Sequence, residues 1–302
     1  MTDSLDKHFD AIVVGSGPAG STAVKELTER GLEVLLLEAG RDITEADFVP
    51  LPPAPPAAMS IDIFSRARAF LRGQYVQGRR AMYQPQKDQF LVNDFQQPYS
   101  TKDGDFLWIR GRQLGGRFHA YGRVLLRASD HEFKGKTLTG RGEDWPISYA
   151  DLEPYYDRIE DFVGVYGEAD GIDNLPDGRY RGPSPLNEAE KHFKKVVEDR
   201  WPERKVVPWR YAAPNLERVP LGVLAARKTG RLTERMNAVV TRVNVSRTTG
   251  RADGVVFIDA KTKKERTVRG DIVMLCASTI ESVRLLLNSA TDRHPDGLAN
   301  SS

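Results

Sequence analysis

The chain has a single cysteine and no long apolar run. Because Cys276 is the only cysteine, an intrachain disulfide and a metal site built on paired cysteines are excluded, and we expect no metal site. No apolar stretch approaches the ~20 residues that a membrane span requires. The N-terminal MTDSLDKHFD lacks the basic start and apolar core of a secretory signal. We therefore expect no membrane span and a cytoplasmic location.

An excess of charge of one sign is also missing. Lysine and arginine number 44 against 42 aspartate and glutamate, which leaves a net charge of +2. This balance predicts no bulk attraction to nucleic acid or to an anionic membrane. Partners have to be inferred from local sites.

A glycine-rich turn follows the first predicted strand. Residues 11–14 form a continuous apolar run, which is typical of a strand buried on both faces. The turn after it carries the pattern G-x-G-x-x-G at Gly15, Gly17 and Gly20. The first glycine permits the turn, the second lets the backbone approach a pyrophosphate, and the third lets helix and strand pack closely. The pattern predicts a dinucleotide site.

The residues after the turn complete this unit. A helix with Ala19, Ala23 and Leu27 on one side is expected, followed by a second buried strand at 34–37. Glu38 ends that strand roughly 20 residues after the last glycine, where an acidic side chain can accept hydrogen bonds from a ribose. The motif suits FAD or NAD equally, and a strand–turn–helix without any ligand is the less favoured alternative.

A second glycine-rich segment, RGRQLGGRFHAYGR at 110–123, resembles the flavin-facing segment of the glucose-methanol-choline (GMC) oxidoreductases. That family shares an arginine-glycine-x-x-leucine-glycine-glycine run, and Arg110, Gly111, Leu114, Gly115 and Gly116 match it position by position. Two adjacent glycines let backbone N–H groups approach a phosphate or a flavin ring. The resemblance implies FAD as the cofactor.

Three further stretches support the resemblance, which runs from about position 9 to about position 290. The segment 144–167 is similar to the tryptophan-proline segment and the helix that follow in the family, with Ser148 and Asp151 predicting the helix start. Val240 matches the valine whose backbone meets the adenine. The stretch DIVMLCASTIESVRLLLNSA is similar to the second family signature, and its ending looks closest to pyranose oxidases and bacterial sugar dehydrogenases.

The resemblance implies a set of cofactor-binding residues and a non-covalent flavin. The implied cofactor contacts are Gly15, Ser16, Gly17, Pro18, Ala19, Gly20, Glu38, Ala39, Arg110, Leu114, Gly115, Gly116, Val240, Ala277 and Ser278. Ala120 occupies the slot of the histidine to which FAD is attached in some members, so a covalent link is not expected. His119 and Tyr121 flank that slot as flavin-proximal candidates, and for His119 a packed, hydrogen-bonded role is favoured over catalysis.

No catalytic base is identifiable. Oxidising an alcohol by hydride transfer requires a group that accepts the hydroxyl proton, usually a histidine. The five histidines are His8, His119, His131, His192 and His294, and none resembles the family's catalytic histidine, which belongs to a C-terminal segment. We therefore expect a truncated chain, and the sequence does not indicate whether this chain is active by itself.

The expected fold is α/β, an FAD-binding Rossmann-like domain with a partial α+β substrate domain. The FAD domain comprises 7–46, the flavin-facing segment 106–130 and a truncated second part at 221–302; a linker and lid-like excursion spans 47–105, and the substrate domain 131–220. Within the excursion, a short helix at 60–71 is expected with Ile63, Ala67, Phe70 and Leu71 on one side and a solvated arginine face on another.

The expected function is FAD-dependent oxidation of a CH–OH group in an alcohol or sugar by hydride transfer to flavin N5. Oxygen, a quinone or an electron-transfer subunit would reoxidise the flavin. A catalytically inactive FAD-binding remnant and, less favoured, a NAD-dependent dehydrogenase are the alternatives.

Overall fold

The computed structural model describes residues 5–48, 63–79, 85–102, 104, 106–213, 215 and 218–300. Within these ranges, the side chains at 45, 63, 65, 66 and 85–87 are not described. The proline-rich part of the predicted linker lies outside the described residues.

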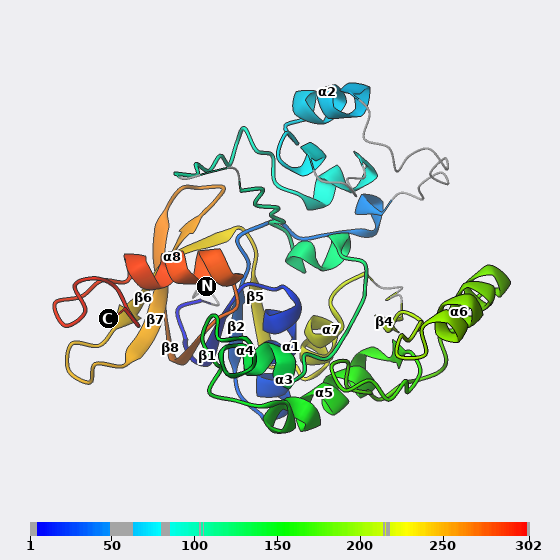
Figure 1. Ribbon diagram of the computed structural model, residues 1–302. Coiled ribbons are helices and arrows are strands. Elements are labelled where there is room, and N and C mark those ends of the chain that lie inside the picture. The colour runs from blue at the N-terminus through cyan, green and yellow to red at the C-terminus, as the bar shows by residue number, and fades with distance from the viewer. Residues whose placement is uncertain are drawn as a thin grey trace. The chain divides into compact units, whose positions relative to one another are not determined.

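The chain forms two compact units, one made of 1–120 and 217–302 and the other of 121–216 (Figure 1). The division lies near 121 and 217, whereas the predicted substrate domain begins at 131 and ends at 220, and the excursion 47–105 groups with the first unit.

The first unit is built on a six-stranded sheet in the order β5-β2-β1-β8-β7-β6. Its strands are β1 (His8–Val14), β2 (Val34–Leu37), β5 (Leu232–Arg235), β6 (Ala238–Val245), β7 (Ala252–Asp259) and β8 (Glu265–Leu275). The strands β5, β2, β1 and β8 run parallel, while β6, β7 and β8 pair antiparallel. In the register, Val14 lies beside both Leu37 and Leu275, so β1, β2 and β8 end at one edge.

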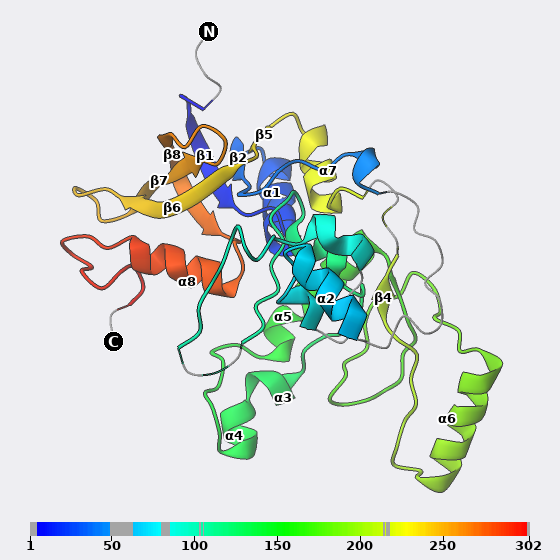
Figure 2. The ribbon, with the colours of Figure 1, turned by 90° about the horizontal axis from the view of Figure 1, so that it is seen from above.

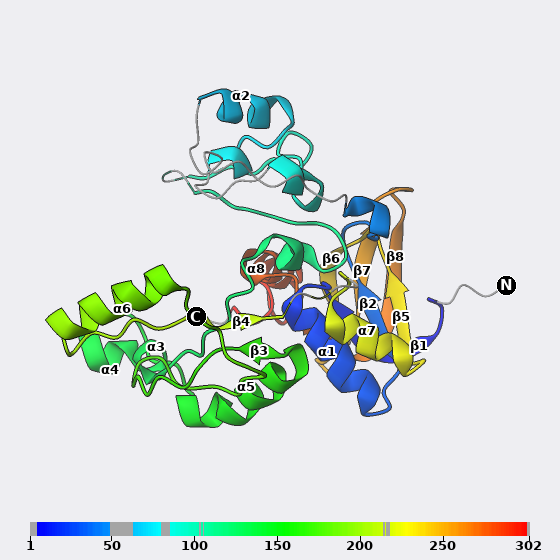
Figure 3. The same cartoon turned by 90° about the vertical axis from the view of Figure 1, so that its right-hand side faces the viewer.

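Apolar side chains cover both faces of the parallel strands. On one face, Val13 and Leu36 pack against α1 (Pro18–Glu29) and α7 (Leu221–Lys228), which lie side by side (Figure 3). On the other face, Ile12 and Leu35 pack with Val240 and Phe257 from β6 and β7. Covering on both faces explains why the two central strands read as continuous apolar runs.

Further helices of the first unit belong to connections around the sheet. Helix α8 (Thr279–Asn288) packs along β6 (Figure 2), where Ser289 Oγ accepts a hydrogen bond from Val243 N–H at 2.8 Å. The other helices are α2 (Ile63–Leu71) and the 3₁₀ turns Glu45–Asp47, Gln77–Arg79, Pro85–Phe90 and Gly116–Ala120. Helix α2 confirms the described part of the helix expected at 60–71.

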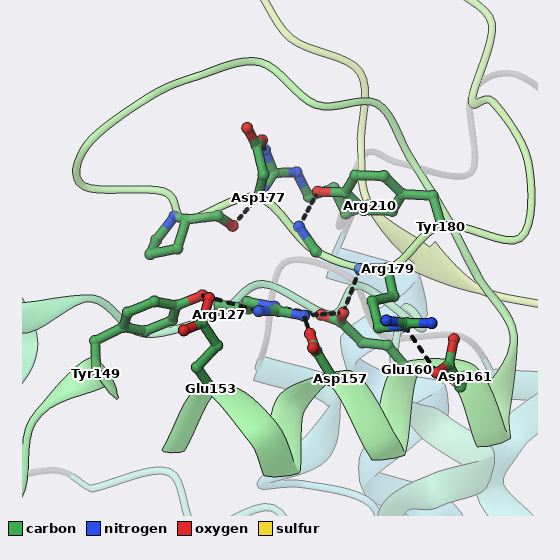
Figure 4. A network of polar contacts seen from close by, with 12 residues as sticks. Arg127, Tyr149, Glu153, Asp157, Glu160, Asp161, Asp177, Arg179, Tyr180 and Arg210 are labelled. Carbon is green, nitrogen blue, oxygen red and sulfur yellow. Dashed lines mark hydrogen bonds and ion pairs between the residues drawn. The ribbon is translucent and has the colours of Figure 1, made fainter. Parts of the chain in front are cut away.

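The regular structure of the second unit is mainly helical. Its elements are α3 (Asp130–Phe133), α4 (Gly135–Thr139), α5 (Tyr149–Val163), α6 (Glu188–Arg200) and the two-stranded pair β3 (Val165–Tyr166) and β4 (Tyr211–Ala212). Helix α5 begins after Ser148, whose N–H donates to Asp151 Oδ2 at 2.8 Å, so the predicted start is confirmed. Two arginines are buried in this unit: Arg127 binds side chains of α5, and Arg210 binds the loop 170–177 (Figure 4).

Candidate cofactor site

The loop between β1 and α1 is shaped by two glycines that have no room for a side chain. Gly15 has a φ of +99°, and a Cβ on it would lie 2.5 Å from the carbonyl oxygen of Cys276. A Cβ on Gly20 would lie 1.8 Å from the carbonyl oxygen of Gly15. Both contacts are closer than any real Cβ tolerates, so the loop requires glycine at these positions.

Gly17, between them, differs because a Cβ there would meet nothing within 4 Å. It is the N-cap of α1, with Pro18 as the first helical residue. None of the described side chains caps this end, and its first turn carries no acidic residue. The first amides of a helix lack partners within the helix and carry the positive end of its dipole. This open end can therefore accept an anionic group such as a pyrophosphate.

Glu38 is buried beside this loop, with 5% of its surface exposed. One carboxylate oxygen accepts hydrogen bonds from Ser16 N–H at 3.1 Å and Ser16 Oγ at 2.5 Å, and the other accepts from Gly40 N–H at 2.8 Å. Burial raises the pKa of Glu38, and these hydrogen bonds work against that increase. The side chain that was predicted to meet a ribose thus also organises the glycine loop.

The second glycine-rich segment meets the first at Ser16. The N–H of Gly115 donates to Ser16 Oγ at 2.9 Å, and a Cβ on Gly116 would lie 3.9 Å from Gly17 Cα. The N–H of Leu114 also donates to Arg41 O at 2.9 Å, which fixes the segment beside the end of β2. The structure therefore brings the two motifs, which lie about 100 residues apart in the sequence, into one place.

Gly40 is a residue of this site that we did not predict from the sequence. A Cβ on Gly40 would lie 1.9 Å from the carbonyl carbon of Arg112, so the crossing of the two segments requires glycine here. The one feature of the sequence that could have indicated Gly40 is its position two residues after Glu38.

His119 packs beneath the paired glycines. Its Nε2 lies 2.9 Å from the carbonyl oxygen of Leu114, and its ring stacks on Phe90 with ring centroids 5.0 Å apart. Since a carbonyl only accepts, Nε2 carries the proton and the imidazole is held in this tautomer. Burial lowers the pKa of His119, which favours the neutral ring. This is the geometry of a histidine that supports the glycine segment.

Arg110 contacts the excursion rather than open space. Its guanidinium donates to Gln97 O at 2.5 Å, lies 3.8 Å from Asp94 Oδ1 and sits over the ring of Trp108 at 4.8 Å. Burial lowers the pKa of Arg110. Arg110 thus joins Asp94, Gln97 and Trp108 to the start of the glycine segment.

Ala277 and Ser278 follow β8 at the same edge of the sheet as the glycine loop. A Cβ on Gly15 would lie 3.1 Å from Ala277 Cα, and Cys276 N–H donates to Val14 O at 2.8 Å. Ser278 caps α8 with φ +74° and ψ 163°, a backbone conformation that side chains rarely adopt. The second family signature thus lies directly against the first glycine.

The remaining predicted residues are less directly connected to the loop. Val240 is buried in β6, and its carbonyl accepts from Arg284 at 3.2 Å. Leu114 is fully buried in the core, Pro18 and Ala19 are exposed at the start of α1, and Ala39 is half-buried. Tyr121 is half-buried at the start of the second unit, and burial raises its pKa.

Comparison with known proteins places these features in context. Residues 13–46 match a family model described as an NAD(P)-binding Rossmann-like domain. The chain is 28% identical to 2-methyl-1,2-propanediol dehydrogenase of Mycolicibacterium austroafricanum, covering 100% of this chain and 54% of that protein. It is 27% identical to the fructose dehydrogenase large subunit of Gluconobacter japonicus, covering 97% of this chain and 56% of that protein. The chain thus spans about half the length of the curated relatives it matches.

A solved structure of formate oxidase from Aspergillus oryzae RIB40, from work on FAD modification in that enzyme, has the same fold. It superposes with a TM-score of 0.56 at 16% identity, covering 97% of this chain and 50% of that one. The predicted α/β class with a Rossmann-like domain is confirmed.

Proposed function

We propose that this chain, a homologue of the GMC-type flavin oxidoreductases over its full length, binds FAD non-covalently through its first unit. It would serve the oxidation of a CH–OH group in an alcohol or sugar. The observation that carries the proposal is the meeting of Gly17 and Gly116, joined through Ser16 and Gly115 at the open end of α1. The helix N-terminus can then bind a pyrophosphate, and the backbone of the second glycine segment lies beside it.

The paired glycines favour FAD over NAD. A nicotinamide site needs only the first motif, which the Rossmann-like match also describes. Here a second glycine segment with φ values of +86° and +51° lies against the first. Bound FAD would supply the acceptor for a hydride, while Gly17, Gly115 and Gly116 would give it backbone contacts without a Cβ in the way.

The substrate class is supported by the relatives, whose names specify a diol and a sugar. The electron acceptor would be oxygen, a quinone or an electron-transfer subunit. We also propose a cytoplasmic location, which a single cysteine suits.

Substitution of Gly17 tests the cofactor site without disturbing the fold. Gly17 has an ordinary φ of −63°, and a Cβ meets no protein atom, so Gly17→Ala should fold normally. The methyl group would occupy the open space next to the helix N-terminus and should weaken FAD binding about tenfold or more, by excluding close approach of the pyrophosphate. The matched control is Gly135→Ala in α4, where a Cβ also meets nothing within 4 Å. Equal FAD affinity for both variants, measured by quenching of flavin fluorescence, would overturn the site.

Anaerobic addition of alcohols and sugars to the FAD-loaded chain separates the functional alternatives. Loss of the oxidised flavin spectrum with a polyol or sugar supports oxidation of CH–OH groups. Bound FAD that no such compound reduces would identify a flavin-binding chain without turnover. A colourless protein whose activity follows added NAD would establish the nicotinamide alternative.

A further inference from the structure

Helix α2 presents its large apolar side chains outward. Ala69 is 1% exposed and packs where Gly78 leaves room for it; a Cβ on Gly78 would lie 2.4 Å from Ala69 Cβ. Phe64 and Leu71, by contrast, are 80% and 83% exposed. At 100° per residue, both lie on the side of the helix opposite Ala69. The small residue of this helix therefore faces the protein, and the large ones face outward.

Aromatic rings extend this surface beyond the helix. Phe70 contacts Phe95 edge-on with centroids 5.3 Å apart, and Tyr75 stacks on Phe95 at 5.7 Å. Phe70 and Phe95 are each more than half exposed. Phe64, Phe70, Leu71 and Phe95 together are called here the α2 surface. Exposed aromatic and aliphatic side chains gathered in this way indicate an interaction site.

Basic residues outnumber acidic ones around the α2 surface, where Asp62 and Asp88 flank a stretch with six cationic side chains. From position 63 to position 87 the sequence contains no aspartate or glutamate, although the whole chain is nearly neutral. The basic residues of this stretch are Arg66, Arg68, Arg72, Arg79, Arg80 and Lys87. Arg68 is exposed on the helix, and Arg72, which lies 3.3 Å from Asp88, keeps half of its side chain exposed. The sequence around α2 therefore carries an excess of positive charge, and Arg68 places one of these charges on the helix that bears the apolar side chains.

We propose that the α2 surface docks on an anionic lipid bilayer. Phenylalanine and leucine flanked by arginine is the composition of short helices that lie in the headgroup region, with the apolar side in the acyl boundary and the cations on the phosphates. The chain would lie on the membrane, since no helix among the described residues is long and apolar enough to cross one. The nearly neutral net charge of the whole chain does not prevent this binding. Salt screens distant charges, so the lipid headgroups interact mainly with the charges within about a Debye length of them. The α2 surface does not include any residue of the proposed cofactor site.

Vesicle co-sedimentation of the full chain tests the proposal. Vesicles of phosphatidylglycerol with phosphatidylcholine should bind the chain, vesicles of phosphatidylcholine alone should bind it much less, and added salt should weaken the binding. The double variant Phe64→Ser/Leu71→Ser should lower the vesicle partition coefficient about tenfold or more. The two apolar side chains that would be buried in the bilayer are absent from it.

The matched control is Phe193→Ser with Val196→Ser on α6. These residues are also exposed, at 60% and 47%, but the four acidic residues of their helix balance its four lysine and arginine residues. The control should bind vesicles as the unchanged chain does. Arg68→Glu should lower binding to the anionic vesicles and reduce its dependence on salt, because it reverses one charge beside the apolar side chains.

Several outcomes would overturn the proposal. No binding to the anionic vesicles would do so, as would equal binding to both vesicle types or equal losses in the α2 and α6 variants. Sedimentation velocity tests the alternative of self-association. If the chain binds no vesicles and forms a dimer that the α2 substitutions dissociate, the α2 surface is a contact between two copies of the chain. Unchanged circular dichroism of each variant shows that it folds.

Discussion

The two units of the chain are stabilised in different ways. The first unit encloses two apolar clusters, one on each face of its parallel strands. In the described part of the second unit the buried apolar side chains are few, namely Phe133, Val165, Pro208 and Ala212, while Arg127, Ser129, Glu160, Ser184 and Arg210 are also buried. Hydrophobic burial tolerates changes of shape, whereas a buried ion network depends on every partner being present.

Arg127 and Arg210 show how such a network replaces a core (Figure 4). Arg127 donates to Glu160 Oε1 at 2.9 Å and to Tyr149 OH at 2.8 Å, and it also contacts Asp157. Its partners hold its pKa above the usual value. Arg210 donates to Pro176 O at 2.6 Å and Asp177 Oδ1 at 2.8 Å. The two guanidinium groups thereby join α5 and the loop 170–179 to the segments that carry them.

The largest effect is expected from Arg127→Met. Removing the guanidinium leaves the buried Glu160 without its ion pair, which should destabilise the second unit by about 3–5 kcal/mol. Hydrogen exchange followed by mass spectrometry should show faster exchange in 121–216 and little change in β1 or β2. Arg179→Met is the control, since Arg179 and Asp161 are both more than half exposed and their ion pair should contribute little to stability. Equal loss of protection in both units would show that they share one stabilising core.

Leu36→Ala probes the apolar core of the first unit. Leu36 is fully buried in the cluster beneath α1, so the truncation should cost about 2–4 kcal/mol through lost burial and a cavity. Denaturant unfolding measures the cost, and FAD affinity should fall with the stability of this unit. Ile272→Ala, at a side chain that is 46% exposed, should cost less than about 1 kcal/mol. A small loss of unfolding free energy in Leu36→Ala would show that the first unit does not depend on its apolar core.

Glu38→Gln tests the buried carboxylate that joins the two motifs. A raised folded pKa means that the folded chain holds the proton more tightly than the unfolded chain does. The resulting stability is present below the ordinary value of 4.5 and is lost as pH rises through the raised pKa. The variant should remove this dependence and, by changing one acceptor into a donor facing protein N–H groups, cost about 1–3 kcal/mol at pH 7. Identical pH profiles of unfolding for both proteins would contradict the assignment.

Asp47→Asn should have the smallest effect. Asp47 accepts from Thr44 N–H at 2.7 Å and pairs with Arg41, and these contacts lower its pKa from 3.8 to about 2. Its contribution is therefore present above pH 3.8 and lost as pH falls through the folded value. The variant should be less stable by about 1 kcal/mol at pH 7 and equal to the parent in strong acid. A difference that persists in strong acid would assign it to packing.

The cofactor loop was predictable because its requirements are local. Strand, glycines, helix and Glu38 follow one another in the sequence, and each has a separate physical reason. The contact of Gly40 with Arg112 and the bond from Gly115 to Ser16 were not predictable, because both arise from a crossing of distant segments. The buried arginines also could not be predicted, since arginine is normally exposed and its partners here come from separate loops. Periodicity predicted the apolar side of α2, but only contact of Ala69 with Gly78 determines which side faces inward.

The visible absorbance spectrum of the purified chain, recorded after gel filtration in the presence of FAD, shows whether the chain binds the flavin. We predict that flavin absorbance travels with the protein, that Gly17→Ala retains less of it at limiting FAD, and that Gly135→Ala retains as much as the unchanged chain. A folded chain that elutes without flavin at saturating FAD would contradict the claim that the two glycine motifs form a cofactor site.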